Sequence, residues 1–244
     1  MNSSIGQDFI NGRQWLESLG FNRCAVLDVE LFDRDLRDAY EAADTAHTAN
    51  ERLVLLGMAG PLLWQHVEKT ARGRDDPFDE YALEVAQAVS QRFWGDGSPR
   101  ILYPGPSRIP LQQLGRFAGW ACASPLGLDI SPLYGPWFAY RAAFLTTSQL
   151  PFTPGGQPAS PCERCESKPC VTACPVGAVQ EKGTFGLQSC LTQRLDDPPG
   201  CGMRCKSRLA CPVGEEHRYS DAQLDYHGQR SFDALRRWSG AKPQ

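Results

Sequence analysis

The sequence predicts an α+β fold made of a larger N-terminal domain and a smaller cysteine-rich module. Apolar strand patterns alternate with amphipathic helix patterns over residues 1–150, and this periodicity ends after a Pro/Gly-rich linker at 151–161. Eight of the ten cysteines then fall between residues 162 and 211. Because this last segment lacks the apolar pattern of a core, we expect bound metal to stabilise it. We assign the module to residues 162–228 and a C-terminal tail to residues 229–244.

The N-terminal domain begins with two apolar runs, at residues 21–32 and 52–60, which predict buried strands. A polar-faced helix is expected after the first run, over residues 33–46. A second helix is expected over residues 61–72, where Pro61 takes the first helical position and its missing N–H costs nothing.

The strongest helix pattern covers residues 75–94, in which apolar side chains recur with helical period. We expect Asp76 to cap this helix, Pro77 to begin it and Asp79 to interact with the positive end of its dipole. Three further features are expected: a strand entering a turn at 100–105, a short helix in 110–123, and two strands around a Pro/Gly turn in 126–150.

The composition argues against several classes of protein. The 244 residues carry a formal net charge of −3, which is not the basic footprint of a nucleic-acid-binding protein. No apolar run approaches the roughly 20 residues of a membrane-spanning helix, and the N-terminus has neither the basic nor the apolar region of a secretory signal. We therefore expect a cytoplasmic protein whose partner is neither a nucleic acid nor a membrane.

The clustered cysteines form two runs of similar design: Cys162-x2-Cys165-x4-Cys170-x3-Cys174-Pro175 and Cys190-x10-Cys201-x3-Cys205-x5-Cys211-Pro212. Each run has three thiols and then a fourth that is followed by proline. In bacterial two-cluster ferredoxins, the fourth cysteine of one run ligates the other cluster. Two four-iron four-sulfur (4Fe–4S) clusters are therefore expected. One would be held by Cys162, Cys165, Cys170 and Cys211, and the other by Cys174, Cys190, Cys201 and Cys205.

The spacing leaves alternatives open, because the x4 and x10 intervals depart from the regular ferredoxin run. The stretched second run would then bind a different cluster or none. Tetrahedral zinc sites use pairs of closely spaced cysteines, and only Cys162–Cys165 and, nearly, Cys201–Cys205 have that spacing. Disulfides are typical of short secreted chains richer in cysteine than this one. Cys24 and Cys122 stand apart from both runs and are expected to be buried packing residues.

The stretch PLYGPWFAYRAAFLTTSQLP (132–151), with the cysteine block after it, resembles the epoxyqueuosine reductases. Residues 75–87, 135–145 and 218–227 are similar to the CblC-type cobalamin-processing proteins. The resemblance implies a nitroreductase-like α/β sandwich that holds cobalamin, joined to a double ferredoxin module. Proteins of this group, which includes reductive dehalogenases, use cobalamin on a substrate such as a modified tRNA base, or reduce and dealkylate cobalamin itself.

The resemblance also indicates where a cofactor would bind. It places Arg141 beside the cofactor pocket, where the guanidinium would bind a phosphate, a carbonyl or a carboxylate. The alternative for Arg141 is an ion pair with Asp129 or Glu80 that stabilises the sheet.

Trp137 and Phe138 would wall a corrin or flavin ring, and Tyr134 belongs to the same set of aromatic residues. Packing in the core is the alternative for these rings, because the two faces of one strand cannot both face a ligand. Weaker candidates also have ordinary structural explanations: the turn at 103–106, Asp76, Asp79, His217 and His227.

These observations give a leading hypothesis and alternatives. The leading one is an iron–sulfur oxidoreductase that receives single electrons from an external low-potential donor. It would pass them to an acceptor in the N-terminal domain, with cobalamin the expected acceptor, flavin a lesser one, and a small molecule as substrate. The main alternative is a ferredoxin-type electron-transfer protein whose N-terminal domain docks a partner and holds no organic cofactor. No residue is indicated as catalytic, and neither a dinucleotide-binding nor an ATP-binding glycine motif is present.

Overall fold

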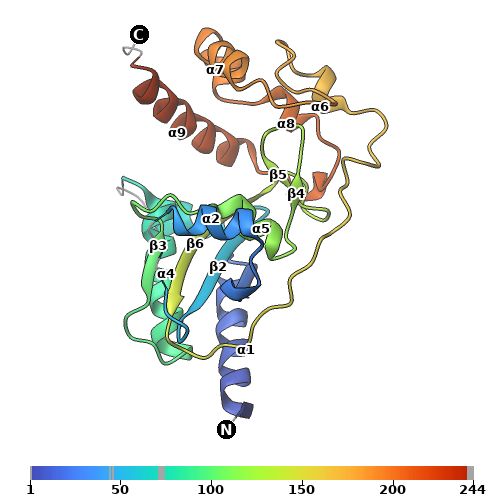
Figure 1. The fold of residues 1–244 in the computed structure, drawn as a ribbon. Coiled ribbons are helices and arrows are strands. Elements are labelled where there is room, and N and C mark those ends of the chain that lie inside the picture. The colour runs from blue at the N-terminus through green and yellow to red at the C-terminus, as the bar shows by residue number, and fades with distance from the viewer. Residues whose placement is uncertain (1, 44, 46, 71–74, 241–244) are drawn as a thin grey trace. The chain divides into compact units, whose positions relative to one another are not determined.

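The computed structural model describes residues 2–43, 45, 47–70 and 75–240. The chain forms two compact units: unit 1 consists of Met1–Trp120 and Phe138–Pro158, and unit 2 of Ala121–Trp137 and Ala159–Gln244. The predicted mixture of helices and strands is confirmed (Figure 1). The unit boundary differs from the predicted one, because residues 121–137 pack with the cysteine-rich segment and the Pro/Gly-rich linker is divided at Pro158.

Unit 1 is built on an antiparallel sheet with the strand order β1-β2-β6-β3. Its strands are β1 (Arg23–Leu27), β2 (Arg52–Ala59), β6 (Phe138–Thr146) and β3 (Arg100–Tyr103). In β2, Leu53, Val54 and Leu55 are completely buried, so both faces of the sheet are covered. The first predicted strand ends early, at Leu27, because Asp28 accepts the N–H of Glu30 and begins a 3₁₀ turn.

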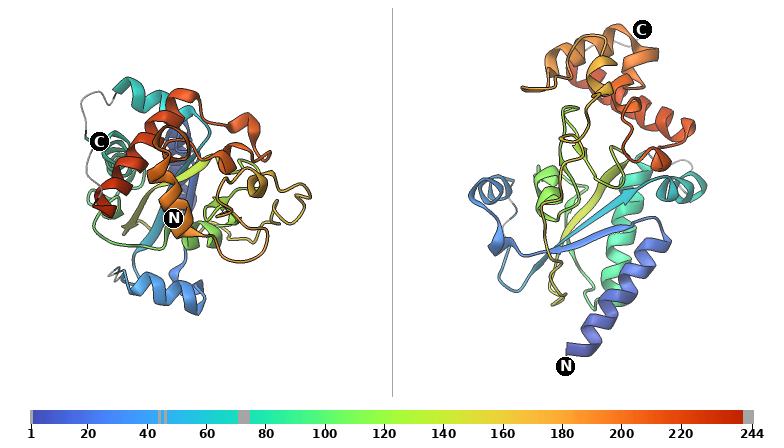
Figure 2. Two further views of the ribbon diagram at one scale, coloured as in Figure 1. Left: turned by 90° about the horizontal axis from the view of Figure 1, so that it is seen from above. Right: turned by 90° about the vertical axis from the view of Figure 1, so that its right-hand side faces the viewer.

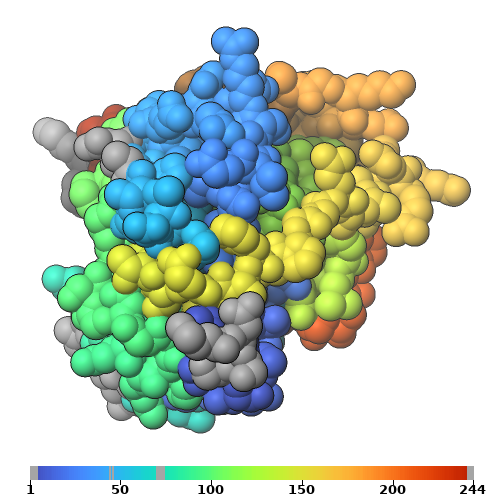
Figure 3. Space-filling view, turned by 60° about the horizontal axis from the view of Figure 1, so that its bottom comes forward, coloured from blue at the N-terminus to red at the C-terminus, as the bar shows by residue number. Residues whose placement is uncertain are grey.

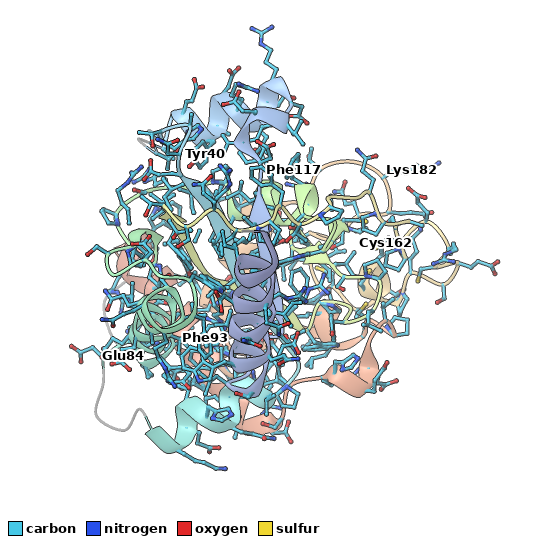
Figure 4. The ribbon with its side chains drawn as sticks, turned by 90° about the horizontal axis from the view of Figure 1, so that it is seen from below. Tyr40, Glu84, Phe93, Phe117, Cys162 and Lys182 are labelled. Carbon is cyan, nitrogen blue, oxygen red and sulfur yellow. The ribbon has the colours of Figure 1, made fainter. Side chains whose placement is uncertain are left out.

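Helices cover both faces of this sheet (Figure 2). Helix α4 (Pro77–Phe93) packs on β6 and against α1 (Asn2–Ser18), and the Trp15 and Phe93 rings meet at 5.6 Å. The N-terminal helix α1 was not predicted. Helices α2 (Arg34–Glu41) and α5 (Leu111–Phe117) meet through Phe32, whose ring contacts both Tyr40 and Phe117. Figure 4 labels Tyr40 and Phe117 on these two helices.

Two predicted helices are found with bounds that differ from the expected ones. Helix α2 ends at Glu41 rather than at residue 46, although residues 44 and 46 lie outside the described residues. Helix α3 (Leu62–Thr70) is the helix expected at 61–72, whose last two residues also lie outside that part of the chain.

The predicted cap of α4 is formed differently. Asp76 occupies the N-cap position, but its side chain accepts no capping hydrogen bond. Instead, its backbone N–H donates to Oε1 of Glu80 at 3.2 Å. The backbone N–H of the N-cap residue is therefore satisfied by a side chain one turn later in the helix.

The Pro/Gly-rich segment after β6 lies extended over the surface of unit 1 (Figure 3). Thr153 pairs with the outer edge of β1: its N–H donates to the Val26 carbonyl at 2.9 Å, and its Oγ1 accepts the Val26 N–H at 3.0 Å. Since unpaired strand edges invite association with other chains, this part of the predicted linker has a structural role.

Unit 2 contains four elements of two to four residues and two longer helices. The short ones are β4 (Cys122–Ala123), β5 (Asp129–Ile130), α6 (Pro169–Thr172) and α8 (Lys206–Leu209), and the longer ones are α7 (Leu187–Asp196) and α9 (Asp221–Ser239). The first of the two strands predicted within 126–150 is reduced to β5, because Pro132, Gly135 and Pro136 interrupt it. Residues 229–239, predicted as a tail, continue α9, which buries Phe232 and Leu235. Residues 241–244 lie outside the described residues.

Two glycines join the distant segments of unit 2. Gly135 and Gly214 have φ of +57° and +66°, values that favour glycine. A Cβ at Gly135 would collide with the Val213 carbonyl, and one at Gly214 with the backbone of Tyr134. This close approach explains why residues 121–137 belong to the cysteine-rich unit. Among the described residues, no helix has both the length and the apolar character needed to cross a membrane.

Candidate functional site

The eight clustered cysteines surround two cavities in unit 2, four to each. Cysteine site 1 is a narrow cavity of about 20 Å³ lined by Cys162, Cys165, Cys170 and Cys211. Cysteine site 2 is a wider cavity of about 720 Å³ lined by Cys174, Cys190, Cys201 and Cys205. Each site thus takes three cysteines from one run and the proline-adjacent cysteine from the other. All ten cysteines of the chain are free thiols.

The thiols of each site are close enough to influence one another's ionisation. Burial raises the pKa of Cys162, and the charges of Cys170, Cys211 and Cys165 raise it further. In site 2, burial raises the pKa of Cys190, and the charge of Cys205 adds to this effect. Cys162 and Cys190 therefore resist ionisation until a positive charge compensates them, which is the behaviour expected of ligands to a cationic centre.

Cys174 is the exception, since its pKa is lowered. Burial acts to raise this pKa, but the backbone N–H groups of Val179, Val176 and Ala178 and the hydroxyl of Ser207 outweigh burial by donating to the sulfur. A ring of donors around one sulfur stabilises its thiolate form. Cys174 is therefore prepared to act as an anionic ligand.

Lys168 determines the path of the loop that carries the site 1 cysteines. Lys168 adopts a left-handed conformation with φ of 39°, and its Nζ donates to the Cys162 carbonyl at 3.0 Å. Lys168 also precedes the first turn of α6, which carries Cys170. The x4 interval before Cys170 accommodates this turn.

Two elements account for the longer interval in the second run. Helix α7 carries Cys190, and the turn Pro198–Gly202 carries Cys201. Asp197 joins them, because its carboxylate accepts the Cys201 N–H at 3.1 Å. The x10 interval that departs from the ferredoxin pattern is thus a helical insertion that still returns Cys201 to the site 2 cavity.

Trp137 lies in the interior of unit 2, where it is completely buried. The Arg208 guanidinium lies 4.8 Å from the Trp137 ring, the Arg218 guanidinium lies 5.5 Å from it, and the Tyr219 ring packs at 5.6 Å. Arg208 also donates to the Pro136 carbonyl at 2.7 Å. This burial disagrees with the prediction that Trp137 walls a cofactor pocket, because a ring enclosed by protein presents no face to a ligand.

Arg141 occupies an irregular position in unit 1. Leu56 and Gly57 of β2 pair with Ala142 and Tyr140, so a bulge leaves Arg141 without a direct partner on β2. Its guanidinium lies 4.4 Å from the Phe78 ring, and its Nε is buried and lacks a hydrogen-bond partner. Bulges often redirect side chains at functional sites, and the buried Nε of Arg141 is one of several donors in this structure that a ligand or an ordered water would satisfy.

Charged side chains surround the same region. The pKa of Tyr103 is raised, mainly by burial and then by the negative charge of Asp79. The positive charge of Arg141 acts in the opposite direction, and the charge of Asp76 adds a smaller increase. Tyr103 and Arg141 therefore share one electrostatic environment with the first turn of α4. The predicted candidates Arg141, Tyr103, Asp76 and Asp79, which are dispersed in the sequence, are brought together there.

The remaining candidates are separated between the units. Phe138 is half-buried in unit 1 and meets Tyr140 edge-on at 5.6 Å, whereas Tyr134 lies in unit 2 against His217 at 4.7 Å. His227 lines site 2.

The two isolated cysteines also differ from each other. Cys24 is buried as predicted, and burial raises its pKa to about 12. Cys122, which was also predicted to be buried, is only half-buried.

The site also contains residues that the sequence did not indicate, namely Ser207, Arg208 and Arg218. Their side chains contact Cys174 or Trp137 only through the folded arrangement of unit 2. Within the described residues, no group of three or more His, Cys, Asp or Glu side chains converges on the position of a single metal ion. The cysteines therefore surround cavities rather than one point.

Comparison with known proteins shows a likeness of fold. The chain is similar to epoxyqueuosine reductase from Streptococcus thermophilus, with 14% identity, a TM-score of 0.54, and coverage of 85% of this chain and 66% of that one. It is similar to the Bacillus subtilis enzyme with 14% identity, a TM-score of 0.58, and coverage of 86% and 66%.

A third structure, epoxyqueuosine reductase with an epoxyqueuosine-modified tRNA stem loop, matches with 15% identity, a TM-score of 0.58, and coverage of 90% and 68%. The chain thus spans about two thirds of the length of these enzymes. The C. elegans B12-trafficking protein CblC matches with 13% identity, a TM-score of 0.48, and coverage of 98% and 99%. No family profile and no curated protein matches the sequence.

Proposed function

We propose that this protein is an iron–sulfur oxidoreductase that holds two 4Fe–4S clusters in unit 2 and transfers single electrons to an acceptor bound by unit 1. The observation that carries the proposal is the sorting of eight cysteines into two sets of four around two cavities. The sets follow the crossed order of two-cluster ferredoxins, in which each run gives its proline-adjacent cysteine to the other cluster.

The donor chemistry of both sites suits this group. Each site offers four thiols, and four cysteine thiolates are the usual ligand set of a 4Fe–4S cluster. A mononuclear zinc site requires four sulfurs about 2.3 Å from one ion, and the described residues contain no group that converges in this way. When bound, the clusters supply one-electron transfer. The chain would bind them, exclude water from site 1 and donate hydrogen bonds to their sulfur ligands.

Cobalamin is our proposed acceptor in unit 1. The fold likeness to epoxyqueuosine reductases supports a reductase scaffold, and the unsatisfied Nε of Arg141 supports a ligand beside β6. Arg141 would donate to a carbonyl or anionic group of the ligand, and the half-buried Phe138 would contact an apolar part. Trp137 does not fit this role because it is completely buried in unit 2.

An anaerobic titration of the cluster-loaded protein with cobalamin tests the acceptor. We expect a saturable shift in the visible spectrum and co-elution on gel filtration. Loss of one charged hydrogen bond in Arg141→Gln should weaken binding roughly tenfold or more. The control is Arg34→Gln, whose side chain is 91% exposed on α2. Clusters with no spectral shift would favour the plain electron-transfer alternative, and a released yellow chromophore would favour flavin.

A modified tRNA base is a second candidate substrate, supported by the fold likeness to the reductase bound to a tRNA stem loop. This likeness opposes the expectation from net charge that no nucleic acid is a partner. Fluorescence anisotropy with a tRNA anticodon stem loop tests it. Salt-dependent binding that exceeds binding to a duplex DNA of equal length would favour tRNA chemistry, and equal or absent binding would exclude it.

A further inference from the structure

The cavity of cysteine site 2 has an apolar rim that is exposed to solvent. Leu128, Val176 and Leu187 line this cavity and are 45%, 40% and 59% exposed, and we call them the site 2 rim. They come from the β4–β5 connection, the turn after Cys174 and the first turn of α7. Three of the ten large apolar side chains exposed in the described part of the chain thus lie around one cavity. Exposed apolar residues that gather in this way mark an interaction surface, whereas scattered ones do not.

The charged side chains that line the same cavity are all basic among the described residues. They are Arg194, Arg204, Lys206 and Arg208. Arg204 forms ion pairs with two carboxylates of α9, Asp221 at 2.8 Å and Asp225 at 2.7 Å. Arg204 therefore adds little net charge to the cavity.

The other three cations keep their charge. Arg194 and Arg208 each donate to a backbone carbonyl, at 3.1 Å and 2.7 Å, so neutral oxygens position both guanidinium groups. Lys206 is exposed on α8. Asp197, which accepts the Cys201 N–H, opposes them with one negative charge. The surroundings of the site 2 cavity are therefore positively charged.

Site 1 has different surroundings. Its cavity measures about 20 Å³, against about 720 Å³ for site 2. Lys168 is the charged residue that lines it, and its Nζ donates to the Cys162 carbonyl. The exposed charged residues within the first run are Glu163, Arg164 and Glu166, which together are acidic. An acidic protein would therefore be attracted to site 2 rather than to site 1.

We propose that the site 2 rim, together with Arg194 and Lys206, is the docking surface for a small acidic one-electron carrier protein. This inference rests on the proposed function, because the centre held in site 2 would receive the electron. One electron passes from the reduced carrier to this centre. The carrier is thereby oxidised by one electron, the centre is reduced by one, and no bond forms or breaks.

The exposure of the site 2 rim favours a protein over a small molecule as the occupant. A small ligand is held inside a cavity that encloses most of its surface, and it would leave side chains such as Leu187 in contact with water. A protein surface would cover them, with apolar contacts at the centre and charged contacts around them. Cys205 is the exposed member of site 2, so its side of the centre faces the solvent from which a carrier approaches.

Isothermal titration calorimetry tests the docking surface on the full chain, reconstituted anaerobically with iron and sulfide. The probe is a purified plant-type ferredoxin, an acidic iron–sulfur carrier, in its oxidised form. We expect binding that weakens as the salt concentration rises, because salt screens the attraction between exposed charges. Lys206→Glu should weaken binding by about fivefold to tenfold. Lys69→Glu is the matched control, because it makes the same change of charge at an exposed position of α3 in unit 1.

A second pair of variants tests the apolar part of the surface. Leu187→Ser should weaken binding, whereas Leu31→Ser, at a 69% exposed position of unit 1, should not. Iron per chain is measured for every variant. If Lys206→Glu does not load its clusters, Leu187→Ser decides the outcome, because it changes another element and no charge.

Stopped-flow spectroscopy supplies an independent readout. Reduction of the clusters by reduced ferredoxin should slow in Lys206→Glu, whereas reduction by a photoreduced deazaflavin, a small molecule that needs no protein docking, should not. Binding that does not depend on salt, or that weakens equally in the rim and control variants, would overturn the inference and leave the proposed function in place. A wild-type chain that holds no iron–sulfur cluster would refute the proposed function, and the inference with it.

Discussion

Unit 1 and unit 2 are stabilised in different ways. In unit 1 the two central strands, β2 and β6, bury successive apolar residues between two layers of helices, with Leu53, Leu55 and Phe144 completely enclosed. Unit 2 has no comparable sheet among its described residues, and it contains two cavities that are each lined by four cysteines. Hydrophobic burial accounts for the fold of unit 1, whereas we expect the fold of unit 2 to depend on the clusters proposed for its two cysteine sites.

Iron removal should produce the largest difference between the units. We expect anaerobic chelation to abolish amide protection in α7 and α8, because bound metal contributes about 10 kcal/mol or more to the folding of small metal-dependent modules. Amides of β2 in unit 1 should keep their protection. Hydrogen–deuterium exchange with peptide-level mass spectrometry measures both regions in one sample. Equal protection of α7 with and without iron would show that unit 2 folds by itself.

Removal of one large core residue from each unit should destabilise both units but reduce the iron content only for unit 2. Phe144→Ala and Trp137→Ala each delete a completely buried ring, and each should cost about 3–5 kcal/mol of unfolding free energy. Only Trp137→Ala should also reduce bound iron, because its ring holds Arg208 and Arg218 beside the cysteine sites.

Urea denaturation and iron per chain are the measurements for this pair. Leu31→Ala is the control, since the Leu31 side chain is 69% exposed and should change neither quantity. If Phe144→Ala lost as much iron as Trp137→Ala, iron binding by unit 2 would depend on the core of unit 1.

A pair of glycines gives the smallest and most specific effect. Gly177 and Gly214 have nearly equal φ, 62° and 66°, so an alanine at either should cost about 1–2 kcal/mol of backbone strain. A Cβ at Gly177 meets nothing within 4 Å, whereas one at Gly214 collides with the backbone of Tyr134. Gly214→Ala should therefore destabilise unit 2 more, as measured by thermal unfolding of the iron-loaded protein. Equal melting temperatures would contradict the close approach of these two segments.

Local pattern was sufficient for most elements of unit 1. The strands at Arg23–Leu27 and Arg52–Ala59 and the helix at Pro77–Phe93 follow from apolar runs and helical period. Helix α1 was missed because its apolar face is weak and polar residues occupy much of its length. Its stability comes from tertiary contacts such as Trp15 with Phe93, which a local pattern does not contain.

The candidate sites were predictable in part from the sequence and in part only from the tertiary structure. The number, order and proline neighbours of the cysteines predicted two sets of four, because ligand chemistry is determined by residue type and spacing. Only the tertiary structure decided that Trp137 is buried between arginines and that a bulge isolates Arg141. These features arise where segments distant in the chain approach closely, as at Gly135 and Gly214, and such long-range contacts leave no periodic signal in the sequence.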